Sequence, residues 1–175
     1  MDHHLFWIAS RAAGTAALLL SSAAVGVGLT MGGRLVKRRG IDLRAAHEAL
    51  SLATLIAIVV HAAALLGDSY LNAGALDITV PFASGYKEPW MSIGIVSGWG
   101  LVALGVSYYF RTRIGAARWK RLHRLAYVAA VLGVVHFFLR VKKDASEPMI
   151  YAALLGLLFA VRIASAALHR RAASR

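Results

Sequence analysis

The stretch AHEALSLATLIAIVVHAAALL, residues 46–66, decides the fold because it is long and apolar enough to cross a lipid bilayer as one helix. It makes up nearly all of a run at about 45–66, and further runs of this kind lie at about 5–31, 90–110, 122–139 and 148–168. In lipid every backbone amide needs a partner, so such runs form helices, and the alternation typical of a membrane β-barrel is absent. The sequence therefore predicts an all-α integral membrane protein, one domain over residues 1–175 with five transmembrane helices.

Composition and charge agree with this prediction. Of the 175 residues 59% are hydrophobic, against roughly 45–50% in soluble domains. The net charge is +12, but the lysines and arginines gather in the first and third connections and in the C-terminal tail. This alternation follows the positive-inside rule. We therefore expect a multi-pass protein of the plasma membrane, with its N-terminus outside and its C-terminus in the cytoplasm, in contact with lipid and not with nucleic acid.

The chain contains no cysteine. This excludes disulfides, cysteine-ligated iron–sulfur clusters and covalently attached haem. Neither a G-x-G-x-x-G motif after a strand-like run nor a P-loop occurs in the sequence. The sequence therefore shows no recognisable nucleotide or flavin domain. We expect any flavin (FMN or FAD) or quinone that takes part to be supplied by a partner.

Histidines occur at two matching depths in two of the predicted helices. His47 and His61 lie in the opening stretch, and His123 and His136 lie in WKRLHRLAYVAAVLGVVHFFLRV, residues 119–141. These two spans cross the membrane in the same direction. His47 and His123 therefore share a level near the cytoplasmic face (the inner pair), and His61 and His136 share a level toward the outside (the outer pair).

Such pairs are suited to two non-covalent b-type haems, each iron held by two neutral imidazoles from facing helices. At ~1.5 Å per residue the two levels are ~20 Å apart, within a hydrocarbon core of ~30 Å. We therefore predict an inner haem iron on His47 and His123 and an outer one on His61 and His136. A zinc site or a proton pathway is the alternative use of these four residues.

The helical periodicity leaves one question open. At 3.6 residues per turn, His61 returns to within ~40° of the direction of His47, whereas His136 is ~140° away from His123. Either the fourth helix is irregular, for example near Gly133, or the two haems approach this helix from different sides.

Three arginines are candidates for binding the haem propionates. Arg44 and Arg124 lie within a turn of the inner ligands, although membrane topology already explains their charge. Arg11 lies near the outer end of the first span, where it could meet an outer propionate or extend to the lipid headgroups. The loop DITVPFASGYKEPW, residues 77–90, is expected to fold over the outer haem.

The histidine spacing, H-x13-H followed by H-x12-H, resembles the ferric reductase-like transmembrane domain family. SRAAG at 10–14, VPFASGYKEPW at 80–90 and WKRLHRLAY at 119–127 add to this resemblance, which covers about residues 5–140. The family includes the membrane domains of NADPH oxidases and ferric reductases, and the haem-binding membrane subunit of the bacterial methionine sulfoxide reductase system. It implies the same two ligand pairs and outward electron flow. Larger members carry a fused FAD/NADPH domain, for which this sequence shows no motif, so we expect the donor domain to be a separate protein.

The sequence thus predicts a di-haem b cytochrome, an oxidoreductase or the electron-transfer membrane subunit of one. The expected donor is a cytoplasmic flavin reductase or a quinol, and the expected acceptor is an outer redox protein, ferric iron or oxygen. One alternative is a quinone-linked di-haem cytochrome such as a superoxide oxidase. Another is a non-redox, histidine-based metal transporter or a structural subunit.

Overall fold

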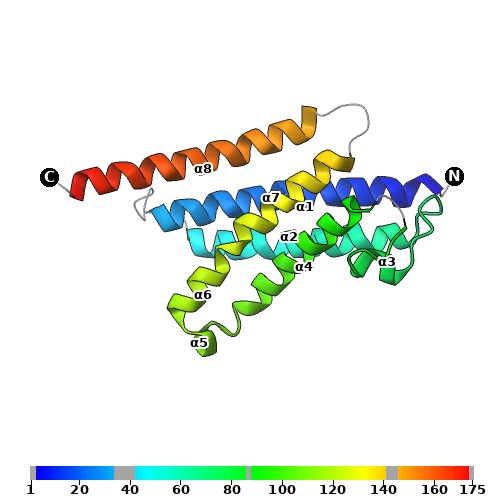
Figure 1. The fold of residues 1–175 in the computed structure, drawn as a ribbon, viewed down its shortest axis with the longest axis horizontal. Coiled ribbons are helices and arrows are strands. Elements are labelled where there is room, and N and C mark those ends of the chain that lie inside the picture. Colours follow the sequence, from blue (N-terminus) through cyan, green and yellow to red (C-terminus); the bar gives the residue numbers. More distant parts are fainter. Residues whose placement is uncertain (1–2, 34–41, 86–87, 141–145, 174–175) are drawn as a thin grey trace.

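The computed structural model describes residues 3–33, 42–85, 88–140 and 146–173, and within these ranges all regular structure is helical (Figure 1). The helices are α1 (His3–Gly33), α2 (Leu43–Leu66), α3 (Ala75–Thr79), α4 (Trp90–Ser107), α5 (Arg111–Ile114), α6 (Ala116–His123), α7 (Leu125–Arg140) and α8 (Ser146–Ala173).

Within the described ranges, four helical segments are long and apolar enough to cross a membrane: His4–Met31, Leu43–Leu66, Trp90–Ser107 and Ala116–Leu139. Their outward faces are apolar as well. On α2, the side chains of Leu52, Ile56 and Val59 are 58%, 57% and 60% exposed. Leucine, isoleucine and valine exposed in a row on one helix face are suited to lipid rather than water. The chain is a multi-pass membrane protein.

The long helices pack side by side in one bundle. In Figure 1, α1 and α2 run antiparallel, α4 and α7 cross them obliquely, and α8 lies along α1. A buried apolar cluster joins three of these helices: Leu18, Val25 and Leu29 from α1, Ala130 and Val134 from α7, and Tyr151 and Leu155 from α8. The two ends of the chain lie at opposite ends of the bundle (Figure 1).

The fourth predicted helix is interrupted, and the interruption lies beside a candidate ligand. α6 ends at His123, Arg124 forms a turn (φ −65°, ψ −18°), and α7 begins at Leu125. α7 passes through Gly133 without a break. The thirteen-residue spacing of His123 and His136 suggested an irregularity in this helix. The irregularity is at Arg124 and not near Gly133. The helical run also starts earlier than predicted, at Ala116, and α4 ends at Ser107, short of the predicted 110.

The predicted fifth span coincides with α8. Among its described residues, the apolar part is Met149–Ala160, which is shorter than the four segments named above. Tyr151 and Leu155 in this part are buried against the bundle, whereas Met149 and Leu157 are about 60% exposed. α8 therefore packs on α1 and α7 through one face.

The connections hold the helix ends in place. Asp42 caps α2, since its carboxylate accepts hydrogen bonds from the backbone N–H groups of Arg44 and Ala45 at 3.0 and 3.2 Å. Gly115 joins α5 to α6 with φ +87°, a conformation that favours glycine. The loop after α2 is attached to α4, because Trp99 Nε1–H donates to Thr79 O at 2.8 Å and Phe82 N–H donates to Ser92 Oγ at 2.8 Å.

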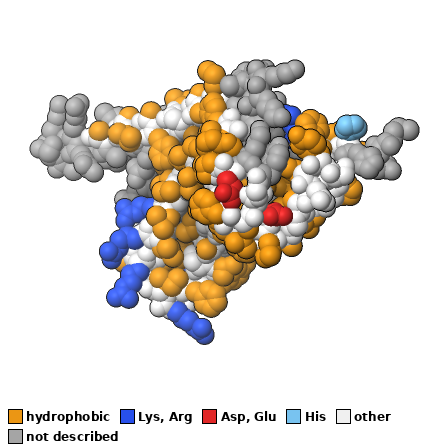
Figure 2. Space-filling model, turned by 45° about the vertical axis from the view of Figure 1, so that its right-hand side comes forward, with side chains coloured by type: hydrophobic (Ala, Val, Ile, Leu, Met, Phe, Trp, Pro, Cys, Tyr) orange, Lys and Arg blue, Asp and Glu red, His pale blue; other side chains and the backbone are white. Residues whose placement is uncertain are grey.

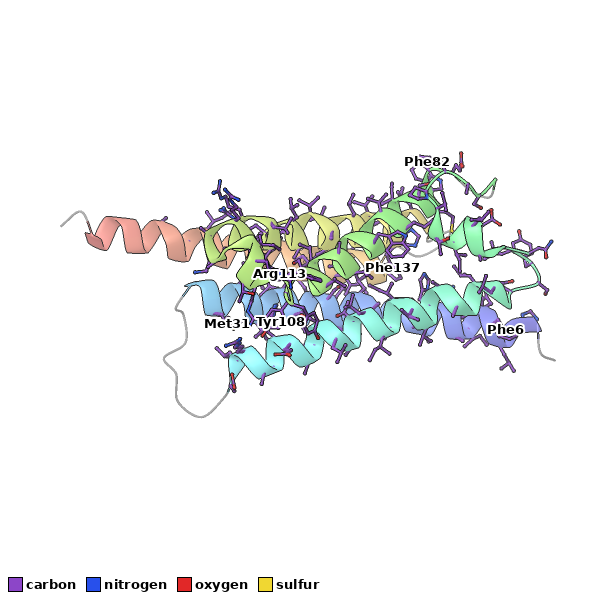
Figure 3. The ribbon with its side chains drawn as sticks, turned by 90° about the horizontal axis from the view of Figure 1, so that it is seen from below. Phe6, Met31, Phe82, Tyr108, Arg113 and Phe137 are labelled. Carbon is purple, nitrogen blue, oxygen red and sulfur yellow. The ribbon has the colours of Figure 1, made fainter. Side chains whose placement is uncertain are left out.

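Basic side chains gather at one end of the molecule, on a surface that is otherwise largely apolar (Figure 2). Exposed residues at this end come from α5, α6 and the turn that follows: Arg113, Arg118, Lys120, Arg121 and Arg124. Figure 3 shows Arg113 and Tyr108 at the same end as Met31, the last part of α1, and Phe6 and Phe82 at the opposite end.

Candidate functional site

The structure brings the four candidate histidines together in the two pairs that the sequence suggests. The ring centroids of His47 and His123 are 6.0 Å apart, with the ring planes at 77°. Those of His61 and His136 are 6.5 Å apart, at 76°. In each pair one ring comes from α2, and the other comes from the last residue of α6 or from α7.

His61 rests against the backbone of α1. Its Nδ1–H donates to the carbonyl oxygen of Ser10 at 2.8 Å. The ring covers Gly14, where an added Cβ would lie only 2.9 Å from Nδ1. The Ser10 hydroxyl donates to the carbonyl of His61 at 3.3 Å and is 3.1 Å from Nδ1. A glycine four residues after the accepting carbonyl therefore makes the close approach possible.

His47 is held on α1 in the same way as His61. We call this arrangement, a helix carbonyl that accepts from Nδ1–H and a glycine under the ring, the seat of the histidine. Its Nδ1–H donates to Ala24 O at 2.9 Å. A Cβ at Gly28, again four residues after the acceptor, would lie 3.3 Å from the ring carbon Cε1.

His136 repeats the arrangement on α4. Its Nδ1–H donates to Trp90 O at 2.8 Å, and a Cβ at Gly94 would lie 2.6 Å from Nδ1. Trp90 is the last residue of the loop that the sequence placed over the outer pair. A backbone carbonyl can only accept, so in all three neutral rings Nδ1 carries the proton and Nε2 is the nitrogen with the lone pair.

His123 is seated differently. Its Nδ1 is buried and has no hydrogen-bond partner among the described residues. Its ring instead stacks on the indole of Trp119, with centroids 4.8 Å apart and planes at 22°.

The space between the inner pair is a cavity of about 90 Å³ among α1, α2, α4, α6 and α7. Its hydroxyl groups are turned to backbone: Ser21, Ser51 and Thr54 donate to the carbonyls of Leu18, His47 and Leu50 at 2.7–2.9 Å. Val25, Leu101 and Leu104 are among its apolar walls. The imidazole nitrogens are therefore the strongest electron-pair donors that face this cavity.

These donor sets fit a metal ion held between two imidazoles. With a metal–nitrogen bond of about 2 Å, two rings bound on opposite sides of one ion have centroids about 6 Å apart, close to both observed separations. The described residues contain no cluster of three or more metal-ligating side chains. A pair of histidines without further protein ligands suits a haem iron, because the porphyrin itself fills the remaining positions.

The structure places the three predicted arginines as follows. Arg44 is exposed at the start of α2, where its Nη2 donates to the hydroxyl of Tyr108 at 3.0 Å. Arg124 is exposed in the turn directly after His123. Arg11 is exposed on α1, with its guanidinium 4.9 Å from the ring centroid of Trp7. Arg11 therefore contacts an exposed aromatic residue on its own helix, beside the seat of His61.

Sequence reasoning missed the residues that seat the histidines. Ser10, Ala24 and Trp90 act through their carbonyls, for which any residue type would serve. The signal that could have found them is a glycine on a neighbouring helix at the depth of each histidine, namely Gly14, Gly28 and Gly94.

The fold and the paired histidines together define an all-helical, multi-pass membrane protein with two imidazole pairs between its helices. Residues 12–134, more than half of the chain, match the family described as ferric reductase-like transmembrane component. The chain belongs to this family.

Three relatives of the chain share one name. A protein-methionine-sulfoxide reductase heme-binding subunit, MsrQ, of Rhodospirillum rubrum is 40% identical over 117 residues, 65% of this chain and 54% of the relative. MsrQ of Caulobacter vibrioides is 38% identical over 79 residues (44% and 38%), and that of Salmonella arizonae is 33% identical over 109 residues (62% and 47%). The chain thus spans about half the length of the curated relatives it matches. No solved structure matches it.

Proposed function

We propose that this chain is a di-haem b membrane cytochrome, with one haem between His47 and His123 and the other between His61 and His136. In this proposal α8 is the fifth membrane helix of the bundle. The haem-binding subunits that resemble the chain support the proposal. The observation that supports it most is the repeated histidine seat, in which Nδ1–H is bonded to a helix carbonyl and the lone pair of the neutral ring lies on Nε2.

The seats give the histidines a defined role. A hydrogen bond from Nδ1–H to a carbonyl fixes the tautomer and the ring orientation, and it raises the basicity of Nε2. The glycines let the rings lie against the helix backbone. Bound haem supplies a one-electron carrier. The chain holds the ligands, and its apolar walls exclude water. Binding and orienting the cofactor in this way is what a protein contributes to such chemistry.

The two sites form a route across the membrane. His47 and His61 lie on one continuous helix, fourteen residues apart, which corresponds to ~20 Å at ~1.5 Å per residue. The basic end of the molecule would face the cytoplasm by the positive-inside rule. A flavin reductase or a quinol would donate there, and an outer redox protein would accept at the other end. By analogy with its relatives, we propose a protein-methionine-sulfoxide reductase as that acceptor.

The test is reduction of the purified protein by each donor class. NADH with a flavin reductase, or a soluble quinol, is added under anaerobic conditions while the α band of reduced b haem is followed. We expect rapid reduction by one of the two donors, and reoxidation by an added outer acceptor. His47→Ala and His61→Ala should each stop the transfer, whereas His4→Ala, at an exposed position on α1, should not. Normal transfer in the first two variants would contradict the proposal.

A further inference from the structure

His123 differs from the other three histidines in two ways. Its buried Nδ1 has no acceptor among the described residues, whereas the other three each donate to a carbonyl. It is also the last residue of α6, directly before the turn at Arg124. Neither a backbone acceptor nor a continuous helix therefore fixes the orientation of this ring.

Trp119 provides the missing constraint. It lies four residues before His123 on α6, so the two side chains project from the same face of the helix. Their rings stack at 4.8 Å and 22°, within the range in which aromatic pairs attract one another. The indole covers one face of the imidazole and limits rotation about its side-chain bonds.

Trp119 is itself held by a neighbouring helix. Its Nε1–H donates to Ser107 Oγ at 3.2 Å, and the buried Ser107 hydroxyl donates to Leu104 O at 2.7 Å on α4. The ring of Tyr108 packs on the indole, with ring centroids 6.2 Å apart and ring planes at 62°. The hydroxyl of Tyr108 accepts from Arg44 of α2 at 3.0 Å, at the end of the molecule shown around Tyr108 in Figure 3.

The geometry points to Trp119 as the positioning residue for the His123 ligand, with an anchored indole in the place that a helix carbonyl takes for the other three histidines. This inference rests on the proposed function. It makes the two haem sites unequal: both outer ligands are bonded to carbonyls, but only His47 is on the inner side. Because an Nδ1–H bond strengthens donation by Nε2, His123 is the weakest of the four ligands and depends most on packing.

The experiment compares Trp119→Leu with Trp99→Leu in the full chain. Trp99 is a suitable control because it is exposed and its Nε1–H also bonds to another segment, at Thr79 O. The electron paramagnetic resonance signals of the two ferric haems are first assigned with His47→Ala and His61→Ala. Haem retention is then measured as the rate of transfer to an added apoglobin.

In Trp119→Leu we expect the inner haem signal to shift and inner haem to be lost about 10-fold faster, the lower end of what removing an outer-shell partner costs in metal affinity. The outer haem and the control should be unchanged. Trp119→Phe, which keeps an aromatic face, should restore most of the retention. Ser107→Ala, which removes only the anchor of the indole, should shift the inner signal in the same direction by less.

An inner haem with an unchanged signal and unchanged retention in Trp119→Leu would overturn the inference, as would equal loss of both haems. If Trp119→Leu does not fold, Ser107→Ala decides, and an unaltered inner signal there overturns it. A wild-type protein without haem would refute the proposed function instead, so the two failures are distinguishable.

Discussion

Gly94→Ala is the sharpest perturbation of the histidine seats. An added Cβ would lie 2.6 Å from Nδ1 of His136, 2.7 Å from Cε1 and 3.0 Å from Cγ. Ordinary contacts begin near 3.4 Å, so the ring must retreat by several tenths of an ångström. That movement carries Nδ1 away from Trp90 O, with which it forms a hydrogen bond of 2.8 Å.

The cost depends on whether the ring is free to move. Without haem, His136 can rotate away from the new methyl group. A ring bound to haem iron, as proposed for His136, could not do so, and overpacking of about 1–3 kcal/mol would then fall on the bound state. Loss of an outer-shell hydrogen bond alone weakens metal binding about 10-fold or more, and about 1.4 kcal/mol corresponds to each factor of ten. We therefore expect outer haem to be retained at least 10-fold less well.

The assay is haem transfer to an excess of apoglobin, followed by absorbance, alongside thermal unfolding of the haem-free protein. Gly98→Ala is the matched control on the same helix, because its Cβ would be 3.5 Å from Ile58, an ordinary contact. The series should follow the distances, with Gly14→Ala intermediate and Gly28→Ala mildest. If Gly94→Ala keeps its haem as well as Gly98→Ala does, the reasoning about the seats is refuted.

Further changes test the surroundings of the sites. Ser10→Ala removes a hydroxyl 3.1 Å from His61 Nδ1 but keeps the accepting carbonyl, so the free energy of outer haem binding should fall by only about 0.5–1 kcal/mol, which is less than 10-fold; a loss as large as that of Gly94→Ala would contradict this view. Asp42→Ala removes the cap of α2 and should lower stability by about 1 kcal/mol, measured by thermal unfolding, with both haem spectra unchanged. Gly115→Ala places a side chain at φ +87° and should cost about 1–3 kcal/mol in the same assay; a neutral result would show that the connection relaxes.

The sequence was sufficient to predict an all-helical membrane protein and to pair the histidines. Both predictions depend on one-dimensional signals, namely the length of apolar runs and the depth of His47, His61, His123 and His136 along them. Depth follows from residue number because the rise per residue is constant.

The interruption at Arg124 was not predictable in the same way. Neither glycine nor proline marks it, and Gly133, which does carry such a signal, lies in regular helix. α6, which ends at this turn, is bonded to α4 through Trp119 and Ser107, and such a tertiary contact has no local signal in the sequence. Likewise, the carbonyls of Ser10, Ala24 and Trp90 have no signature in the identity of their side chains. Only the glycines four residues later reveal them.

The central claim is that two imidazole pairs each hold one haem, and the most direct measurement is the haem-to-polypeptide ratio of purified protein by pyridine haemochrome and amino-acid analysis. We expect two b haems per wild-type chain, one haem in each of the single variants His47→Ala and His61→Ala, and none in the variant that carries both changes. A wild-type ratio near zero, or variants that keep both haems, would contradict the account.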